Sequence, residues 1–176
     1  MLRPRIRQYI VLLMAGVWAA PSPAHDGTVN VTGKIVDNTC AVSAESSSLL
    51  VTFGNVSSKR FARQGDGSRY QPFTIKLERC GASASNVSVT FYGDADSHNP
   101  ALLRLTPEAG VATGIAIALY DNDKNLIPLD QPGGGTPLTP NQTSVWLNFY
   151  ARYLANGDSV SSGPANASAT FMLNYA

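Results

Sequence analysis

Residues that could do acid–base chemistry are few in this 176-residue chain, which has only two histidines, His25 and His98. A Ser/His/Asp triad needs a histidine that its neighbours hold in a pocket. His98 lies in the segment Asp94–Asn99, whose serine and aspartates give it a superficial likeness to such a site. The polar sequence around it is more typical of a solvated loop, and no pair of carboxylates falls on adjacent predicted strands. The sequence therefore predicts no catalytic residue and no enzyme activity.

Two further segments resemble ligand-binding loops only in part. Asp121–Asn125 has the start of a calcium-loop spacing, but it lacks the central glycine and the closing glutamate, so a β-turn is predicted. Gly133–Gly135 has neither a following helix nor the Lys-Ser/Thr of a phosphate-binding loop. We therefore expect no metal ion, no cofactor and no small-molecule substrate.

The charge of the chain is sparse and balanced, with 13 Lys and Arg against 12 Asp and Glu. Such a balance supports neither nucleic-acid binding nor attachment to an anionic membrane. Serine, threonine, asparagine, glycine, alanine and valine dominate, and this composition favours strands and turns over helices. One segment is mildly basic, and we interpret it as a solvated face, with contact to a partner as the alternative; its cations are Lys59, Arg60, Arg63 and Arg69.

The first 24 residues have the pattern of a secretory signal peptide. Three arginines precede the apolar run Tyr9–Ala20, which is too short to span a bilayer and about right for a signal-peptide core. Ser22 and Ala24 are small residues at the positions that a signal peptidase reads, which predicts cleavage after Ala24. A membrane anchor is the alternative, but no stop-transfer pattern follows. The mature chain, residues 25–176, is long enough for one packed domain.

Cys40 and Cys80 are the only cysteines of the chain. In an exported protein, two cysteines most simply form one disulfide, and free thiols are the alternative. A closed loop of about forty residues would gain roughly 4 kcal/mol in the loop-entropy account of disulfide stabilisation.

The C-terminal segment, residues 163–176, alternates in the way of a half-buried strand. Among its even-numbered residues from 166 to 174, four are polar and Met172 is the exception; the polar ones are Asn166, Ser168, Thr170 and Asn174. A chain that stops on such a strand has nothing after it to cover the strand's edge, so we expect another element to cover it. The apolar odd-numbered residues are Ala167, Ala169, Phe171, Leu173 and Tyr175.

Other short segments with strand character recur at a spacing of roughly ten residues, with turn residues between them and no convincing helix. This pattern predicts an all-β sandwich of seven to nine strands. Gly114–Tyr120 is apolar on both faces, so it should be deeply buried. The other segments are Thr28–Val36, Leu49–Phe53, Phe73–Leu77, Val87–Phe91, Leu126–Leu129 and Val145–Tyr153.

Several motifs together resemble the subunits of chaperone–usher pili. An alternating strand precedes Asp37-Asn38-Thr39-Cys40-Ala41-Val42, which resembles the end of the family's N-terminal extension and its first cysteine, and Cys80 stands where the second is expected. Leu147–Tyr153 resembles the penultimate strand of the family. Tyr175 next to the end and Gly163 fourteenth from the end match the family's chaperone-recognition pattern. The likeness covers the whole mature chain.

Within that family, Ala95–Asn99 with Leu102 and Leu103 is most similar to the minor tip-adapter subunits of type 1 fimbriae. The major rod pilin is the alternative role. A single-domain adhesin that binds host glycan is a further alternative, although Cys40 comes only about fifteen residues into the mature chain and leaves no room for a separate lectin domain ahead of it.

The resemblance implies an incomplete immunoglobulin-like sandwich that lacks its last strand and is completed by a strand donated from another protein. Residues 1–24 would be the signal peptide, 25–36 the donor strand and 37–176 the pilin domain. A periplasmic chaperone would fill the groove first. At the outer-membrane usher, the N-terminal extension of the next subunit would replace it. The partners implied are these two proteins and neighbouring subunits, including a tip adhesin, and the location implied is the fimbrium on the cell surface.

The resemblance also implies which residues form the joint between subunits. The donor strand would present Val29, Val31 and Ile35 on one face, with Gly33 in the same register where the groove is shallow. The acceptor groove and the chaperone-recognition site would consist of Leu147, Phe149, Gly163, Ala169, Phe171, Leu173 and Tyr175.

Overall fold

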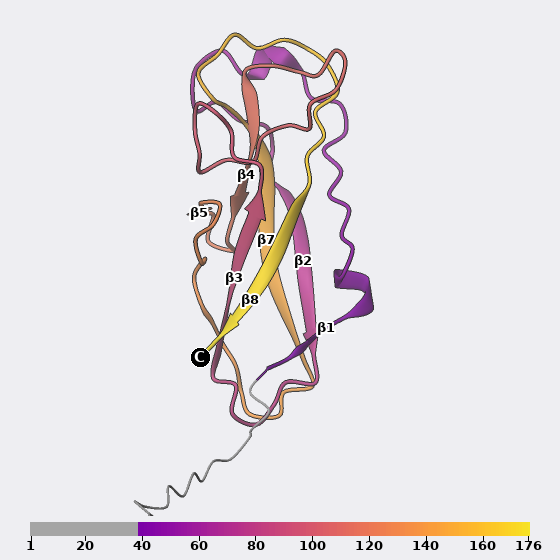
Figure 1. Ribbon diagram of the computed structural model, residues 1–176, viewed down its shortest axis with the longest axis vertical. Coiled ribbons are helices and arrows are strands. Elements are labelled where there is room, and N and C mark those ends of the chain that lie inside the picture. Colours follow the sequence, from indigo (N-terminus) through magenta and orange to yellow (C-terminus); the bar gives the residue numbers. More distant parts are fainter. Residues whose placement is uncertain (1–38) are drawn as a thin grey trace, which may run out of the picture. The chain divides into compact units, whose positions relative to one another are not determined.

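The structure is a computed structural model that describes residues 39–176 (Figure 1). These residues fall within one compact unit, Ile35–Ala176. The predicted signal peptide and the predicted donor strand, with Val29, Val31, Gly33 and Ile35, lie outside the described residues.

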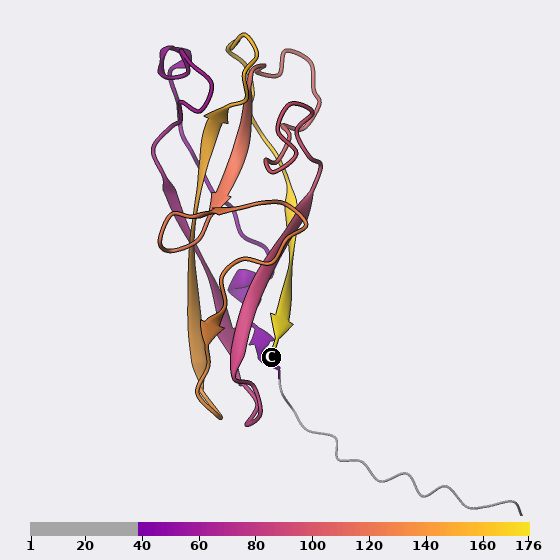
Figure 2. The ribbon, with the colours of Figure 1, turned by 90° about the vertical axis from the view of Figure 1, so that its left-hand side faces the viewer.

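The described residues form two antiparallel sheets, which confirms the predicted all-β fold. Figure 2 shows them as two layers that face each other. The larger sheet has five strands in the order β1-β2-β7-β4-β5. Its strands are β1 (Ala41–Val42), β2 (Gln71–Glu78), β7 (Ser144–Ala155), β4 (Ile115–Tyr120) and β5 (Leu126–Ile127).

The smaller sheet has three strands in the order β6-β3-β8. They are β6 (Thr136–Pro137), β3 (Asn86–Gly93) and β8 (Ala169–Tyr175). β3 and β8 pair along their length, from Val87 opposite Tyr175 to Gly93 opposite Ala169. Two single-turn 3-10 helices, η1 (Ala44–Ser46) and η2 (Ser58–Arg60), are the only helical segments within residues 39–176.

Side chains from both sheets meet in one core between the layers. Ile75 and Leu77 of β2 are fully buried there. The ring of Phe149 on β7 stacks against Phe73 at 5.5 Å and meets Phe91 of β3 edge-on at 5.3 Å. Aromatic pairs in these geometries stabilise a core beyond the area they bury, so these three rings join the two sheets.

The alternation predicted for Val145–Tyr153 is confirmed in β7, where every second residue is buried. The prediction for Gly114–Tyr120 is also confirmed, because all six residues of β4 are buried. Ile117 of β4 packs into the core, whereas Tyr120 packs into a second apolar cluster that includes Leu102.

Aromatic and cationic side chains cover part of the outer face of the five-stranded sheet. The guanidinium of Arg152 lies 4.6 Å from the ring centre of Tyr70 and 5.2 Å from that of Tyr120. Its Nε also donates a hydrogen bond to the Tyr120 hydroxyl at 3.1 Å. Lys124 lies over the rings of Tyr70 and Tyr150 at 5.2 and 5.9 Å. Cations are attracted to aromatic faces, so this cluster holds together β4, β7, the turn after β4 and the loop before β2.

The prediction of a strand at Leu49–Phe53 is wrong, because this segment belongs to neither sheet. In this N-terminal part of the domain, only the two residues of β1 pair with β2, and the helix η1 begins two residues after β1 ends. Without a neighbouring strand the segment has no ladder of hydrogen bonds, and the side chain of Leu50 is 92% exposed. The terminal strand also begins later than predicted, at Ala169, since the chain before it bonds to loops, for example through the Pro164 carbonyl to the Ala112 amide at 2.9 Å.

The disulfide between Cys40 and Cys80 is confirmed, with an S–S distance of 2.05 Å. Cys40 immediately precedes β1, and Cys80 follows β2 after Arg79, which has a positive φ of 52°. The bond therefore fastens the short strand β1 to the end of β2.

Gly114, at the start of β4, is a position where any side chain should be costly. Its φ is +75°, and a Cβ there would lie 2.7 Å from the carbonyl oxygens of Asp158 and Ser159. Gly110 offers a matched control, because its φ is +72° but nothing lies within 4 Å of the position that a Cβ would take. Both alanine variants incur backbone strain of about 1–2 kcal/mol, and Gly114→Ala adds the clash.

We expect Gly114→Ala to melt at a clearly lower temperature than Gly110→Ala when both are followed by circular dichroism. Equal melting temperatures would show that the loop carrying Asp158 yields easily to a methyl group.

Candidate functional site: an unpaired strand edge beside an apolar groove

β8 is an edge strand, because it pairs with β3 on one side and with no strand of the described residues on the other (Figure 1). Its residues Ala169–Tyr175 make no backbone hydrogen bond outside this ladder within residues 39–176. The free edge therefore presents unpaired N–H and C=O groups over most of its length. Such an edge is a template on which another strand can add.

An apolar groove of about 710 Å³ opens beside the first half of β8. Ala169 and Phe171 line it from β8, and the segment Leu49–Phe53 lines it from the opposite side. Its inner wall consists of core residues of both sheets, among them Ile75 and Ile117. The groove is thus an opening into the hydrophobic core between the two sheets.

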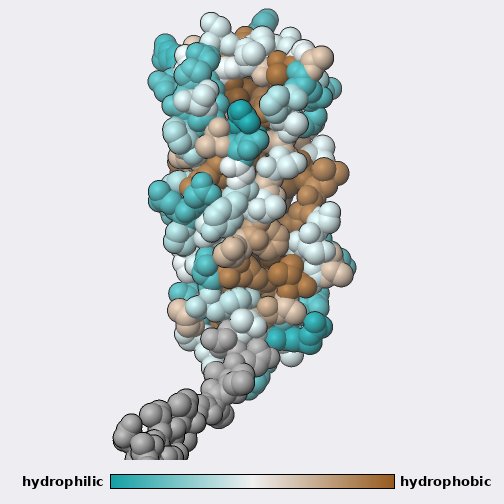
Figure 3. All heavy atoms as spheres, in the orientation of Figure 1, coloured by the Kyte–Doolittle hydropathy of each residue, from teal (hydrophilic) through white to brown (hydrophobic). Residues whose placement is uncertain are grey.

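Apolar side chains also gather at the surface along this side of the domain. Leu49 and Leu50 in the opposite wall are 41% and 92% exposed. Figure 3 shows hydrophobic residues over the face on which β8 and this segment lie. A large exposed apolar patch on a small domain marks an interaction site.

The predicted acceptor residues fall into three groups. Ala169 and Phe171 line the groove. Leu173 and Tyr175 lie further along β8 on the same half-buried face, so the predicted alternation of this strand is confirmed. The remaining three lie elsewhere: Leu147 and Phe149 are buried in the core, and Gly163 lies in the loop before β8, against the carbonyl of Gly110.

Sequence reasoning misses part of the groove wall. Leu103, Ile117, Leu119 and Ala151 line the groove, although the sequence patterns assign none of them to it. The apolar character of Gly114–Tyr120 on both faces is a signal that these side chains are buried. It cannot show that they border an opening.

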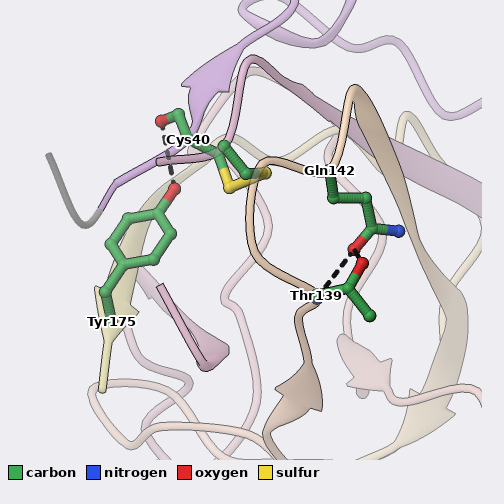
Figure 4. Close-up of a disulfide and its surroundings, with 5 residues drawn as sticks. Cys40, Thr139, Gln142 and Tyr175 are labelled. Carbon is green, nitrogen blue, oxygen red and sulfur yellow. Dashed lines mark hydrogen bonds between the residues drawn. A yellow bond between two sulfur atoms is a disulfide. The ribbon is translucent and has the colours of Figure 1, made fainter. Parts of the chain in front are cut away.

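The end of β8 is fastened to the disulfide region of the other sheet (Figure 4). The hydroxyl of Tyr175 donates a hydrogen bond to the carbonyl oxygen of Cys40 at 3.1 Å. Ala176 and Asn86 also exchange a pair of backbone hydrogen bonds, each at 3.1 Å. Burial raises the pKa of the Tyr175 hydroxyl, and its hydrogen bond to the Cys40 carbonyl opposes that rise. The strand edge is therefore held at its C-terminal end while its free side stays open.

The segments with a partial likeness to catalytic or calcium-binding loops have structural roles. The buried carboxylate of Asp96 accepts hydrogen bonds from the backbone amides of His98 and Asn99 and from the side-chain amide of Asn156. His98 is roughly half exposed, with its Nε2 atom 3.2 Å from a carboxylate oxygen of Asp158. In Asp121–Asn125 the Asp121 carboxylate accepts from backbone amides within the predicted turn.

Residues 39–176 contain no group of three or more metal-ligating side chains that could hold an ion. Over the same residues, no helix is long and apolar enough to cross a bilayer.

Two antiparallel sheets, one disulfide and an edge strand beside an opening in the core define a pilin-like sandwich. Comparison with known proteins agrees: the family model described as "Fimbrial protein" matches residues 29–176. Long polar fimbria protein A of Salmonella typhimurium is 37% identical over 93% of this chain and 92% of its own length. Fimbrial-like protein FimF of the same organism is 35% identical over 93% and 92%.

A subunit in a solved chaperone–usher pilus is 25% identical and superposes with a TM-score of 0.64, over 89% of this chain and 100% of its own. The chain belongs to the fimbrial protein family. It is a structural fimbrial subunit of the chaperone–usher kind, with the immunoglobulin-like fold of pilins.

The raised pKa values of Tyr175 and Tyr153 predict a loss of stability in alkali. Burial raises the pKa of both hydroxyls above the ordinary value near 10. A raised pKa in the folded state means that stability is fully present below pH 10 and falls as pH rises through the folded-state values. We expect the free energy of unfolding to decline above about pH 10.

Tyr175→Phe should reduce this decline and should also cost roughly 0.5–1.5 kcal/mol at neutral pH through the lost hydrogen bond. Tyr92→Phe is the control, since Tyr92 lies on the neighbouring strand β3 and its hydroxyl makes no hydrogen bond within residues 39–176. Denaturant unfolding at pH 7 to 11 measures both effects. Equal behaviour of the two variants would contradict the role given to Tyr175.

Proposed function

We propose that the groove beside β8 accepts a β-strand donated by a neighbouring subunit, and that this chain acts in assembly of the fimbrium rather than in catalysis. The single observation that supports this proposal is the unpaired edge of β8 beside an opening into the core. An added strand would satisfy the free backbone groups of β8, and its inward side chains would fill the groove. Strand addition of this kind is already known for pilins.

The predicted donor strand, Thr28–Val36, has the chemistry that such a groove requires. Its residues alternate, so that Val29, Val31 and Ile35 share one face with Gly33. Aliphatic side chains at every second position match an apolar groove beneath one strand edge. The same chain thus carries a candidate donor at its N-terminal end and the acceptor at its C-terminal end, as a repeating head-to-tail assembly needs.

The energies explain why an empty groove is a problem. Burying three aliphatic side chains contributes about 1.5–3 kcal/mol each, or roughly 5–9 kcal/mol in total. A whole domain is typically stable by about 5–15 kcal/mol. A subunit with an empty groove therefore lacks a stabilising free energy comparable to the total stability of a domain. It also exposes the edge of β8, and such an edge is prone to aggregation. The proposal accordingly includes a periplasmic chaperone that occupies the groove before assembly at an outer-membrane usher.

Two places in the fimbrium are compatible with this groove. The adapter role rests on the likeness of Ala95–Asn99 with Leu102 and Leu103 to minor tip subunits. In the structure, Leu102 is fully buried and Leu103 lines the groove, so these two leucines pack inside the domain. The relatives include both a fimbrial-like protein FimF and a fimbrial subunit type 1 of Salmonella typhimurium. The rod role is therefore the second candidate. The two roles differ in whether copies of this chain alone can assemble into a polymer.

The first test changes adjacent residues on opposite faces of β8. Phe171 lines the groove, whereas Met172 points outward and is 53% exposed. Phe171→Glu would place a charge in the apolar groove, and Met172→Glu is the matched control. We expect at least a tenfold loss of affinity for a synthetic Thr28–Val36 peptide in the first variant, since an unpaired buried charge costs more than about 1.4 kcal/mol.

Peptide affinity is measured by fluorescence anisotropy on the purified mature chain. The same peptide should raise the melting temperature of the wild-type chain and of Met172→Glu. A stable monomer that ignores the peptide would contradict the proposal, as would equal peptide binding by both variants.

The second test removes the donor. A chain without residues 25–36 should bind the peptide normally but should form no polymer, because it has no strand to donate. If the wild-type chain alone grows into long polymers, it is a rod subunit, whereas failure to grow without a different subunit supports the adapter. Polymers formed by the truncated chain would show that the donor lies elsewhere.

A further inference from the structure

A second, polar pocket shares a lining residue, Phe53, with the groove, and nothing in the assembly function uses it. Its volume is about 310 Å³, and Phe53 lines both cavities. This volume is at the small end of the range for small-molecule sites, which is about 300–1,000 Å³. Its polar lining side chains are Asn55, Arg60, Ser68, Arg69 and Gln71.

The pocket carries uncompensated positive charge. Neither the Arg60 nor the Arg69 guanidinium makes an ion pair or a hydrogen bond within residues 39–176. The same segment carries Lys59 and Arg63 and only one carboxylate, Asp66. One oxygen of that carboxylate already accepts a hydrogen bond from the Arg63 backbone amide at 2.8 Å. Two free guanidiniums in one small pocket are suited to bind an anionic group bidentately.

The wall near Arg69 is rigid. The loop before β2 is bonded to β7, with Ser68 donating its amide to the Tyr153 carbonyl at 3.0 Å and Gly65 donating to Ala155 at 3.0 Å. Gly67 packs so closely on β7 that a Cβ there would lie 2.9 Å from the Arg152 side chain. The backbone that carries Arg69 is therefore positioned before any ligand arrives.

The opposite wall is anchored as well. The ring of Phe53 packs on that of Tyr153 at 4.3 Å. The Tyr153 hydroxyl in turn donates to the Ala165 carbonyl at 2.7 Å. Arg60 lies at the end of η2, where its amide donates to Ser57 at 3.1 Å. The backbone on both sides of the pocket is therefore held in place, and a ligand would have to order only the side chains of the two arginines.

The remaining lining residues narrow the chemistry of the ligand. Asn55 and Gln71 have side-chain amides that both donate and accept hydrogen bonds, as sugar hydroxyls require. Phe53 offers an apolar surface for the C–H groups of a sugar ring. The Ser68 hydroxyl already accepts a hydrogen bond from the Tyr153 amide and donates one to the Arg69 carbonyl, so its one proton is not free for a ligand. A simple phosphate would use the guanidiniums but neither the amide acceptors nor the apolar wall.

We propose that this pocket binds an acidic saccharide, with Arg60 and Arg69 on its carboxylate or sulfate and with Asn55 and Gln71 on its hydroxyls. The site is separate from the donor-strand groove, and the proposal does not depend on the assembly function. It would give a shaft or adapter subunit its own contact with anionic glycan.

The test measures binding of the full mature chain to four probes: a sialoside, a glucuronate-containing disaccharide, a sulfated disaccharide and neutral lactose. We expect binding of at least one acidic probe and none of lactose. Comparing the affinity for the first two probes with the affinity for the third shows whether the pocket prefers a carboxylate or a sulfate. A hexaglutamate peptide is included as a control, because a protein partner with acidic side chains would also bind these arginines.

The matched variants remove the same charge in two places. Arg60→Gln/Arg69→Gln changes the pocket, and Lys59→Gln/Arg63→Gln removes equal charge from neighbouring residues that do not line it. The pocket variant should weaken binding about 10- to 100-fold or more, the range for losing charge-assisted hydrogen bonds, and the control less than about threefold. All four residues are exposed, and melting curves confirm folding.

Three results would overturn the proposal. One is an equal loss of affinity in both double variants, which would indicate that the basic segment attracts acidic ligands without a specific site. Another is binding of hexaglutamate as tight as that of any saccharide, which would indicate a protein partner. The third is no acidic probe bound above lactose.

Discussion

Within residues 39–176 the smaller sheet has no strand beyond β8, and the rest of the domain is arranged around that gap. A sandwich is stable when both inner faces are covered and its edges are paired or protected. Here one edge is unpaired just where Phe171 and Ile117 border an open groove. Hydrophobic burial and backbone hydrogen bonding are therefore incomplete at the same place. One added strand can satisfy both, which makes folding and assembly a single physical problem in this family.

Specific contacts hold most of the domain around the gap, whereas the groove wall at Leu49–Phe53 has no partner strand within residues 39–176. The disulfide and the Tyr175 hydroxyl fasten the C-terminal end of β8 to the region of β1. On the far side of the larger sheet, the cluster of Arg152 with Tyr70 and Tyr120 secures β4 and β7 from outside. A partner that fills the groove would therefore meet the edge of β8, which is paired with β3, on one side and a wall without strand pairing on the other.

Periodicity alone predicts much of the fold. It predicts β7, the double burial of β4 and the inward face of β8, because each of these strands has neighbours that turn an apolar pattern into burial. It fails at Leu49–Phe53, whose composition is that of a strand but which has no partner strand within residues 39–176. The resemblance assigns Leu147 and Phe149 to the groove, and the structure places both in the core, where Phe149 packs with Phe73 and Phe91.

By itself, the sequence determined the all-β class, the disulfide and an apolar face on the last strand, since these depend on residue type and on the two-residue period of a strand. Only the tertiary structure decided that β8 lies at an edge, that the groove opens beside Ala169 and Phe171, and that Arg60 and Arg69 line one pocket. Strand order and the meeting of distant loops depend on which strands pair across long sequence separations. No local pattern encodes that choice, because a strand of a given alternation can pair with any partner that covers its apolar face.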